Sequence, residues 1–281
     1  MTETPVDDEA DDPRWGLVDE GLLSPVLEEW RLIYLENQPA WFTLARDLNR
    51  CTIELYQQHL DAGNGGPSHA QAPTAVRIYA RALNAYAAAV ILAERALAIE
   101  AAGAVRPIYE SGFWLSFLAV DPVKALEELR VDEDAQAVQR ERLLREQYTG
   151  DAALIAASIQ RETDRQNRLG KRKAISIKAV AETMPEQSGY LEYRLLSNFY
   201  GHLSTGSLDN LKRSVGEKAV INILGPHEEQ IPMALFFATD AMTRTAGYFA
   251  VMMKEEKTVE RLRALRARML ALIGTDPAGA S

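Results

Sequence analysis

The stretch EYRLLSNFYGHLSTGS, Glu192 to Ser207, carries a histidine where the leucine spacing of a helix calls for an apolar side chain. At about 100° per residue, His202 falls on the face defined by Leu191, Leu195, Phe199 and Leu203. An imidazole there could act as a general acid or base. It could equally be a core histidine satisfied by one hydrogen bond, or a cap where Gly201 loosens the helix. The sequence leaves both interpretations open.

Other polar residues surround this histidine in the same stretch. Arg194 and Asn198 are four residues apart and border the same face, which makes them candidate binding residues. Tyr193, Ser197 and Tyr200 fall on the other side. An intact helix therefore excludes a nucleophilic pair of Ser197 with the histidine.

A second pair of polar residues interrupts the apolar segment RPIYESGFWLSFLAV. Arg106 and Glu110 are four apart and share a face with three aromatic residues, Phe113, Trp114 and Phe117. An ordinary ion pair explains the spacing at a gain of about 0.2–0.5 kcal/mol. Charges among aromatic residues on a buried helix nevertheless need partners. We therefore predict that Arg106, Glu110 and His202 converge in a partly buried pocket and are the candidate catalytic residues.

The sequence does not suggest a metal or a cofactor. The four histidines, at 59, 69, 202 and 227, include no pair at helical ligand spacing, and no Glu-x-x-His motif occurs. The single cysteine, Cys51, excludes an internal disulfide and is typical of a small buried apolar side chain. No glycine-rich phosphate loop is present.

Charge is distributed unevenly along the 281 residues. The net charge is -9, and residues 1–12 alone contribute six acidic side chains and no basic one, so the remainder carries only about -3. The runs QRETDRQNRLGKRK and Arg261 to Arg268 are basic, although such runs are more often solvated faces than nucleic-acid sites. No uncharged apolar run approaches the ~18 residues of a membrane span, and we expect a cytoplasmic protein without membrane contact.

The hydrophobic pattern is almost entirely helical. A seam with residues three or four apart runs from Val76 to Leu97, and it predicts a helix from Pro73 to about Gly103 packed against one from Val105 to Val120. Asp121 and Pro122 are suited to cap and open the next helix. We also expect the helical pattern to be broken or kinked near Pro39 and the charged helical pattern to end near Gly170. Only residues 219–224 could be extended. The predicted fold is all-α, a single multi-helix bundle over 15–274 with a charged helical excursion in the middle, between an acidic tail (1–14) and a frayed end (275–281).

The two motifs together resemble a known group of proteins. RPIYESGFWLSFLAVDP resembles the central arginine-then-glutamate helix of an uncharacterised bacterial helical family, and YRLLSNFYGHLS matches its Tyr-x3-Ser-x4-His pattern at Tyr193, Ser197 and His202. That family looks related to the HEPN superfamily, which includes AbiV-like abortive-infection proteins, toxins and ribonucleases. The resemblance covers about Val76 to Glu256 and implies that Tyr193 and Ser197 are binding residues of the same site as Arg106, Glu110 and His202. It departs from catalytic members, in which four to six residues separate an arginine from the histidine, because seven residues follow Arg194 here.

Two functional hypotheses follow. The resemblance implies an RNA-directed protein of a bacterial defence or toxin–antitoxin system, with His202 as acid or base and arginines on phosphate. The alternative is a non-catalytic helical module that binds a small ligand or a protein partner. The resemblance also implies a homodimer, and the last helix offers apolar surface for one unless that surface folds back on its own bundle: Leu262, Leu265, Met269 and Leu272.

Overall fold

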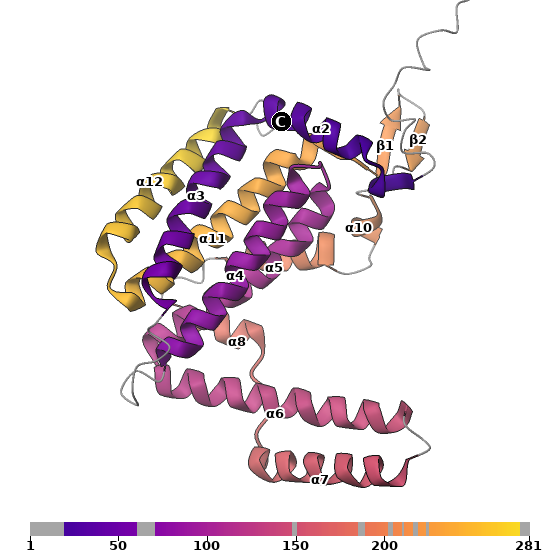
Figure 1. Cartoon of the computed structure of the whole chain (residues 1–281), viewed down its shortest axis with the longest axis vertical. Helices are drawn as coiled ribbons and strands as arrows, with labels where there is room; N and C mark the ends of the chain where they lie inside the picture. Colours follow the sequence, from indigo (N-terminus) through magenta and orange to yellow (C-terminus); the bar gives the residue numbers. More distant parts are fainter. Residues whose placement is uncertain are drawn as a thin grey trace, which may run out of the picture.

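The computed structural model describes residues 20–60, 71–147, 151–184, 189–201, 205–209, 211–215, 219–222 and 225–275. These residues form an all-α bundle to which one small β-hairpin is attached, as the hydrophobic pattern predicts (Figure 1). The predicted acidic tail lies outside the described residues, as do His69 and His202.

Six helices build the bundle. They are α2 (Val26–Asn37), α3 (Pro39–Gln58), α4 (Gln71–Ala93), α5 (Ala98–Val120), α11 (Ile231–Met253) and α12 (Glu256–Thr275). The chain is broken at Pro39, as predicted, and this proline stands in the first turn of α3, where its missing N–H has no partner to lose. A short 3₁₀ turn precedes α2 (Gly21–Leu23) and another precedes α11 (Glu228–Gln230).

The centre of the bundle is the packing of α4 and α11 against α5. Alanine lines much of α4, so the neighbouring helices approach it closely, and the aromatic residues of its seam are sealed in the core. Tyr79 and Tyr86 are fully buried, and their hydroxyls donate to the carbonyl oxygens of Thr52 and Ala45. These hydrogen bonds tie α4 to α3. α4 is also the one described helix whose length and hydropathy would suit a membrane span.

The boundary between α4 and α5 differs from the prediction. The helices meet at residues 94–97 and not at Gly103, which lies inside α5. Ala96 takes the left-handed conformation, with φ of 53°, and its carbonyl accepts a hydrogen bond of 2.8 Å from the His227 amide. A contact distant in sequence thus stabilises a turn that the local sequence does not indicate. The predicted packing of the two helices is confirmed.

The charged excursion is a helical hairpin of α6 (Pro122–Gln147) and α7 (Ala152–Leu169), and in Figure 1 it extends away from the bundle. Asp121 caps α6, its carboxylate accepting from the Lys124 amide at 3.0 Å. Gly170 ends α7 at a φ of 57°, where glycine carries no Cβ penalty.

The chain then returns to the bundle through short elements. α8 (Ile177–Ala181) and α9 (Tyr190–Leu196) pack on α5, and a π-helical turn (Ser197–Gly201) continues α9. After α10 (Thr205–Asp209), strands β1 (Lys212–Val215) and β2 (Ala219–Asn222) pair antiparallel, with Lys212 opposite Asn222. Extended structure was predicted for residues 219–224 alone, so β2 was anticipated and β1 was missed.

The last helix folds back on its own bundle. α12 packs on α3 and α11, and Leu262, Leu265 and Met269 are buried there. The apolar surface that suggested a dimer is therefore already covered within one chain. Self-association stays a prediction that rests on the family resemblance alone.

Candidate functional site

A polar cluster joins α4, α5 and α9 at the surface of the core. Glu110 lies between two guanidinium groups, with its Oε2 3.3 Å from Arg81 and its Oε1 3.8 Å from Arg106. The Tyr193 hydroxyl accepts from Arg106 at 3.1 Å and donates to Glu110 Oε1 at 3.3 Å. The Arg106 guanidinium also lies 5.2 Å from the centre of the Tyr193 ring. We call these four residues the Arg106 cluster.

The charge and burial of the Arg106 cluster decide what it can bind. Two arginines face one carboxylate, so the cluster carries a net charge of +1. The side chains of Arg106 and Glu110 are each 24% exposed, which leaves their polar ends within reach of a ligand. The Arg106 Nε is shielded from solvent and has no hydrogen-bond partner among the described residues. The arrangement is a pre-oriented, partly exposed positive group.

An aromatic contact fixes α9 beside the cluster. Phe113 on α5 packs against the rings of Tyr190 and Tyr193, at centroid distances of 6.4 and 5.8 Å. The helix enters this contact at Gly189, whose φ is 96° and where a Cβ would lie 3.2 Å from the Tyr109 ring. Only glycine fits this approach without strain. The position of Tyr193 in the cluster follows from this docking.

The buried face of α9 is opposite to the one predicted. Leu191 is 67% exposed and Leu195 is 39% exposed, whereas Tyr193, Leu196 and Ser197 are buried. The prediction failed because it counted tyrosine as polar. In the structure the Tyr193 ring lies on the core side, and its hydroxyl finds partners in Arg106 and Glu110.

The other predicted site residues divide into two groups. Ser197 is buried, and its hydroxyl donates to the Tyr193 carbonyl at 2.7 Å, so it is engaged with the backbone one turn earlier. Arg194 on α9 and Asn198 in the π-helical turn are exposed. The predicted meeting of His202 with Arg106 and Glu110 stays untested, because that histidine lies outside the described residues. The structure does bring Arg106, Glu110 and Tyr193 together.

The family comparison covers the part of the chain that contains the Arg106 cluster. Residues 74–218, just over half of the chain, match the model of a family described only as a family of unknown function, DUF5677. The chain belongs to the DUF5677 family. No curated protein and no solved structure matches it. The DUF5677 region runs from α4 to β1 and contains every residue of the Arg106 cluster, whereas α11 and α12 lie beyond it.

A second buried polar network crosses the boundary of the DUF5677 region. Asp240, 3% exposed on α11, accepts from the Tyr109 hydroxyl at 3.0 Å and from Arg244 Nε at 2.7 Å. Burial raises the pKa of Tyr109 well above its usual value, and the nearby Asp240 carboxylate adds to this effect. The sequence offered the signal: Asp240 and Arg244 are four apart in an apolar helix, as Arg106 and Glu110 are.

The cysteine and two of the histidines considered in the sequence analysis have clear surroundings in the structure. Cys51 is buried, and burial raises the pKa of its thiol, which fits a structural role. His227 is 2% exposed, and neither ring nitrogen has a hydrogen-bond partner among the described residues. His59 lies 3.1 Å from Glu255 through Nε2. Within the described residues, no cluster of three or more histidine, cysteine or acidic side chains could hold a metal ion.

Three of the six basic residues in the run QRETDRQNRLGKRK form ion pairs inside the α6–α7 hairpin. Arg161 pairs with Glu141 at 2.8 Å, and Arg168 pairs with Asp134 at 2.7 Å. Arg172, beyond α7, pairs with Glu127 on α6. Such paired arginines hold a helix hairpin together and offer little charge to a polynucleotide.

Proposed function

We propose that this DUF5677 protein is a non-catalytic helical binding module whose Arg106 cluster receives a phosphate group of a small ligand. The observation that carries the proposal is the Arg106 guanidinium, held in one orientation by Glu110 and Tyr193 while a quarter exposed. Its planar set of donors matches the oxygens of a phosphate.

The existing contacts of Glu110 and of the nearby Ser197 favour binding over catalysis. The Glu110 carboxylate is shared by two arginines, and the Ser197 hydroxyl is committed to a backbone carbonyl. Neither of these two groups is poised to take a proton from a substrate. A nucleotide suits the surroundings, because Tyr190, which lies beside the Tyr193 ring of the cluster, is partly exposed and a base can stack on an aromatic ring.

Titration of the full-length protein with adenosine 5′-monophosphate, and separately with adenosine, tests this proposal. We expect the monophosphate to bind the more tightly of the two. Arg106→Gln should weaken it at least tenfold, because a hydrogen bond to a charged group contributes about 1.5–3 kcal/mol. Arg77→Gln, one turn earlier on α4 than Arg81, is the matched control and should change nothing. Equal binding of the two compounds, or an unchanged Arg106→Gln, would refute a phosphate site.

The RNA-directed function implied by the HEPN resemblance is the second candidate. It is supported by the position of the cluster, since Tyr193 and the π-helical turn lead directly into the segment that carries His202. π-helical turns are frequent at functional sites. Degradation of a labelled RNA by the wild type and not by His202→Ala would favour this candidate over a binding module. Intact RNA in both samples would argue against it.

A further inference from the structure

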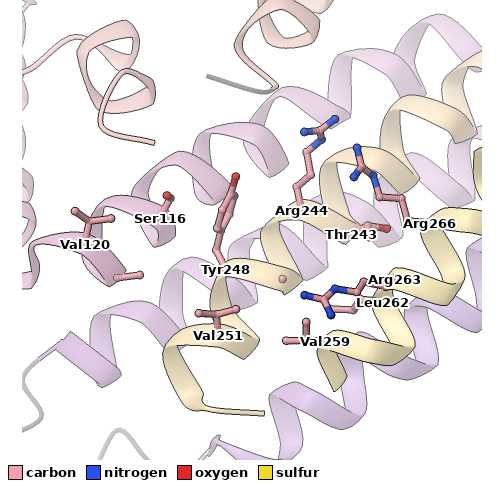
Figure 2. Close-up of a pocket in the computed structure, with 12 residues that line it drawn as sticks. Ser116, Val120, Thr243, Arg244, Tyr248, Val251, Val259, Leu262, Arg263 and Arg266 are labelled. Atoms are coloured by element: carbon pink, nitrogen blue, oxygen red, sulfur yellow. The ribbon is translucent and has the colours of Figure 1, made fainter. Parts of the chain in front are cut away.

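A pocket of about 520 Å³ lies between α5, α11 and α12 (Figure 2), and none of the residues that line it belongs to the Arg106 cluster. Its volume is in the range of small-molecule sites. Gly247 on α11 lines it, and a Cβ built on that glycine would meet no atom within 4 Å. Val120 and Val251 line it while remaining 60% and 62% exposed. The pocket is therefore open and mainly apolar.

Positive charge borders this apolar space. Arg244 extends from α11, and Arg263 and Arg266 come from α12 (Figure 2). Arg244 is held by Asp240, but among the described residues neither Arg263 nor Arg266 makes an ion pair. The other arginines of α12 behave differently, since Arg261 pairs with Glu54 and Arg268 with Asp47.

A buried hydroxyl supplies an independent indication of a ligand. Thr243 lines the pocket and is 6% exposed, and its Oγ1 has no hydrogen-bond partner among the described residues. A buried donor without an acceptor is costly, and natural proteins rarely keep one without a reason. An oxygen of a bound molecule would satisfy it.

We infer that this pocket binds a small amphipathic carboxylate, with its apolar body over Gly247 and its carboxylate between Arg263 and Arg266. Charge complementarity selects an anion, and the apolar lining selects a hydrocarbon body. A second protein chain fits less well, because a stable interface uses about 20–30 residues a side and only twelve line the pocket. The inference uses none of the residues of the proposed phosphate site.

Displacement of a fluorescent anilinonaphthalene sulfonate by decanoate, measured on the full-length protein, tests the inference. We expect decanoate to displace the probe more strongly than decanol does. Gly247→Leu should abolish probe binding, because its side chain would fill the open space. Gly274→Leu is the matched control, since it is also helical and also has open space at the Cβ, but it does not line the pocket. It should bind as the wild type does.

Loss of the rim charges separates anion recognition from simple apolar binding. The double variant Arg263→Gln with Arg266→Gln should weaken decanoate about fivefold, as expected for exposed charges, and leave decanol unchanged. Val251→Trp, at the exposed mouth, serves as a second blocking variant if Gly247→Leu does not fold. Probe binding that survives the blocking variants, or decanol equal to decanoate, would overturn the inference. So would a dimer that Gly247→Leu dissociates in sedimentation, because a second copy would then occupy the pocket.

Discussion

The bundle and the α6–α7 hairpin are both helical, yet different forces hold them. The faces of α4, α5 and α11 that meet are lined by fully buried apolar side chains, and Tyr79 stacks on Phe249 with ring centroids 4.2 Å apart. The hairpin instead uses two buried carboxylates, Glu141 and Glu162, which bind arginines from the facing helix. Burial of apolar area is insensitive to pH and is only weakly affected by moderate salt, whereas ion pairs respond to both.

This difference indicates how the two regions should respond to change. Removing one large side chain from the bundle leaves a cavity that its neighbours cannot fill. Removing one apolar side chain from the hairpin surface should cost little stability. Removing a buried carboxylate leaves the arginines around it without their ion-pair partner. Mutations in the core therefore test the bundle, and a fall in pH tests the hairpin.

The largest effect is expected in the bundle. Phe249→Ala should lower the free energy of unfolding by about 3–5 kcal/mol, because Phe249 is fully buried and stacked on Tyr79. Chemical denaturation followed by circular dichroism measures the change. Leu143→Ala, at a hairpin position that is 61% exposed, should lie within about 0.5 kcal/mol of the wild type. Equal losses in both variants would abolish the distinction between the regions.

An intermediate effect is expected at Gly112, where α5 packs tightly against Thr245 of α11. A Cβ at Gly112 would lie 2.7 Å from Thr245 Oγ1, a hydroxyl that donates to the Ile108 carbonyl at 3.0 Å. Gly112→Ala should therefore destabilise the bundle by about 1–3 kcal/mol. Gly247→Ala, on α11 with open space, should instead stabilise it by up to about 1 kcal/mol. If the melting temperatures of both variants shift in the same direction, α5 and α11 repack freely around Gly112 and the predicted difference is wrong.

The sequence predicted most of the helices but not how α9 docks. Periodicity and caps depend on neighbouring residues, so the break at Pro39, the Asp121 cap and the end at Gly170 were all recognisable. The face of α9 depends on Phe113, which is distant in sequence, and on tyrosines that bury their rings while bonding through their hydroxyls. The turn at Ala96 likewise depends on the amide of His227.

The candidate site was predictable only in part, because some of its residues carry a local sequence signal and others are brought in by distant contacts. Arg106 and Glu110 stand out because charges in an apolar helix need partners. Arg81 does not stand out in the sequence, because it borders an apolar run on α4 and an arginine in that position is usually solvent-exposed. Only the packing of α4 on α5 brings it to Glu110.

The smallest effect on the whole molecule should be the response of the hairpin to acid. Hydrogen bonds from Arg161 and then from Ser158 lower the pKa of Glu141 to about 2 from its usual 4.5. The folded state therefore holds this carboxylate ionised more strongly than the unfolded state does. The stabilisation is fully present above about pH 4.5 and is lost as the pH falls towards 2. The pKa of Glu162 is lowered in the same direction, by its hydrogen bonds from Arg142 and Arg145.

Amide deuterium uptake, corrected for the intrinsic effect of pH on exchange, should rise in α6 and α7 over that interval while α4 and α11 stay protected. Glu141→Gln should raise uptake in the hairpin already at pH 7 and flatten its further dependence on pH, because the titrating carboxylate is gone and Arg161 loses its partner. Glu146→Gln, an exposed glutamate on the same helix, should behave as the wild type does. If bundle and hairpin lose protection together as the pH falls, the hairpin does not depend on its ion pairs more than the bundle does, and the comparison fails.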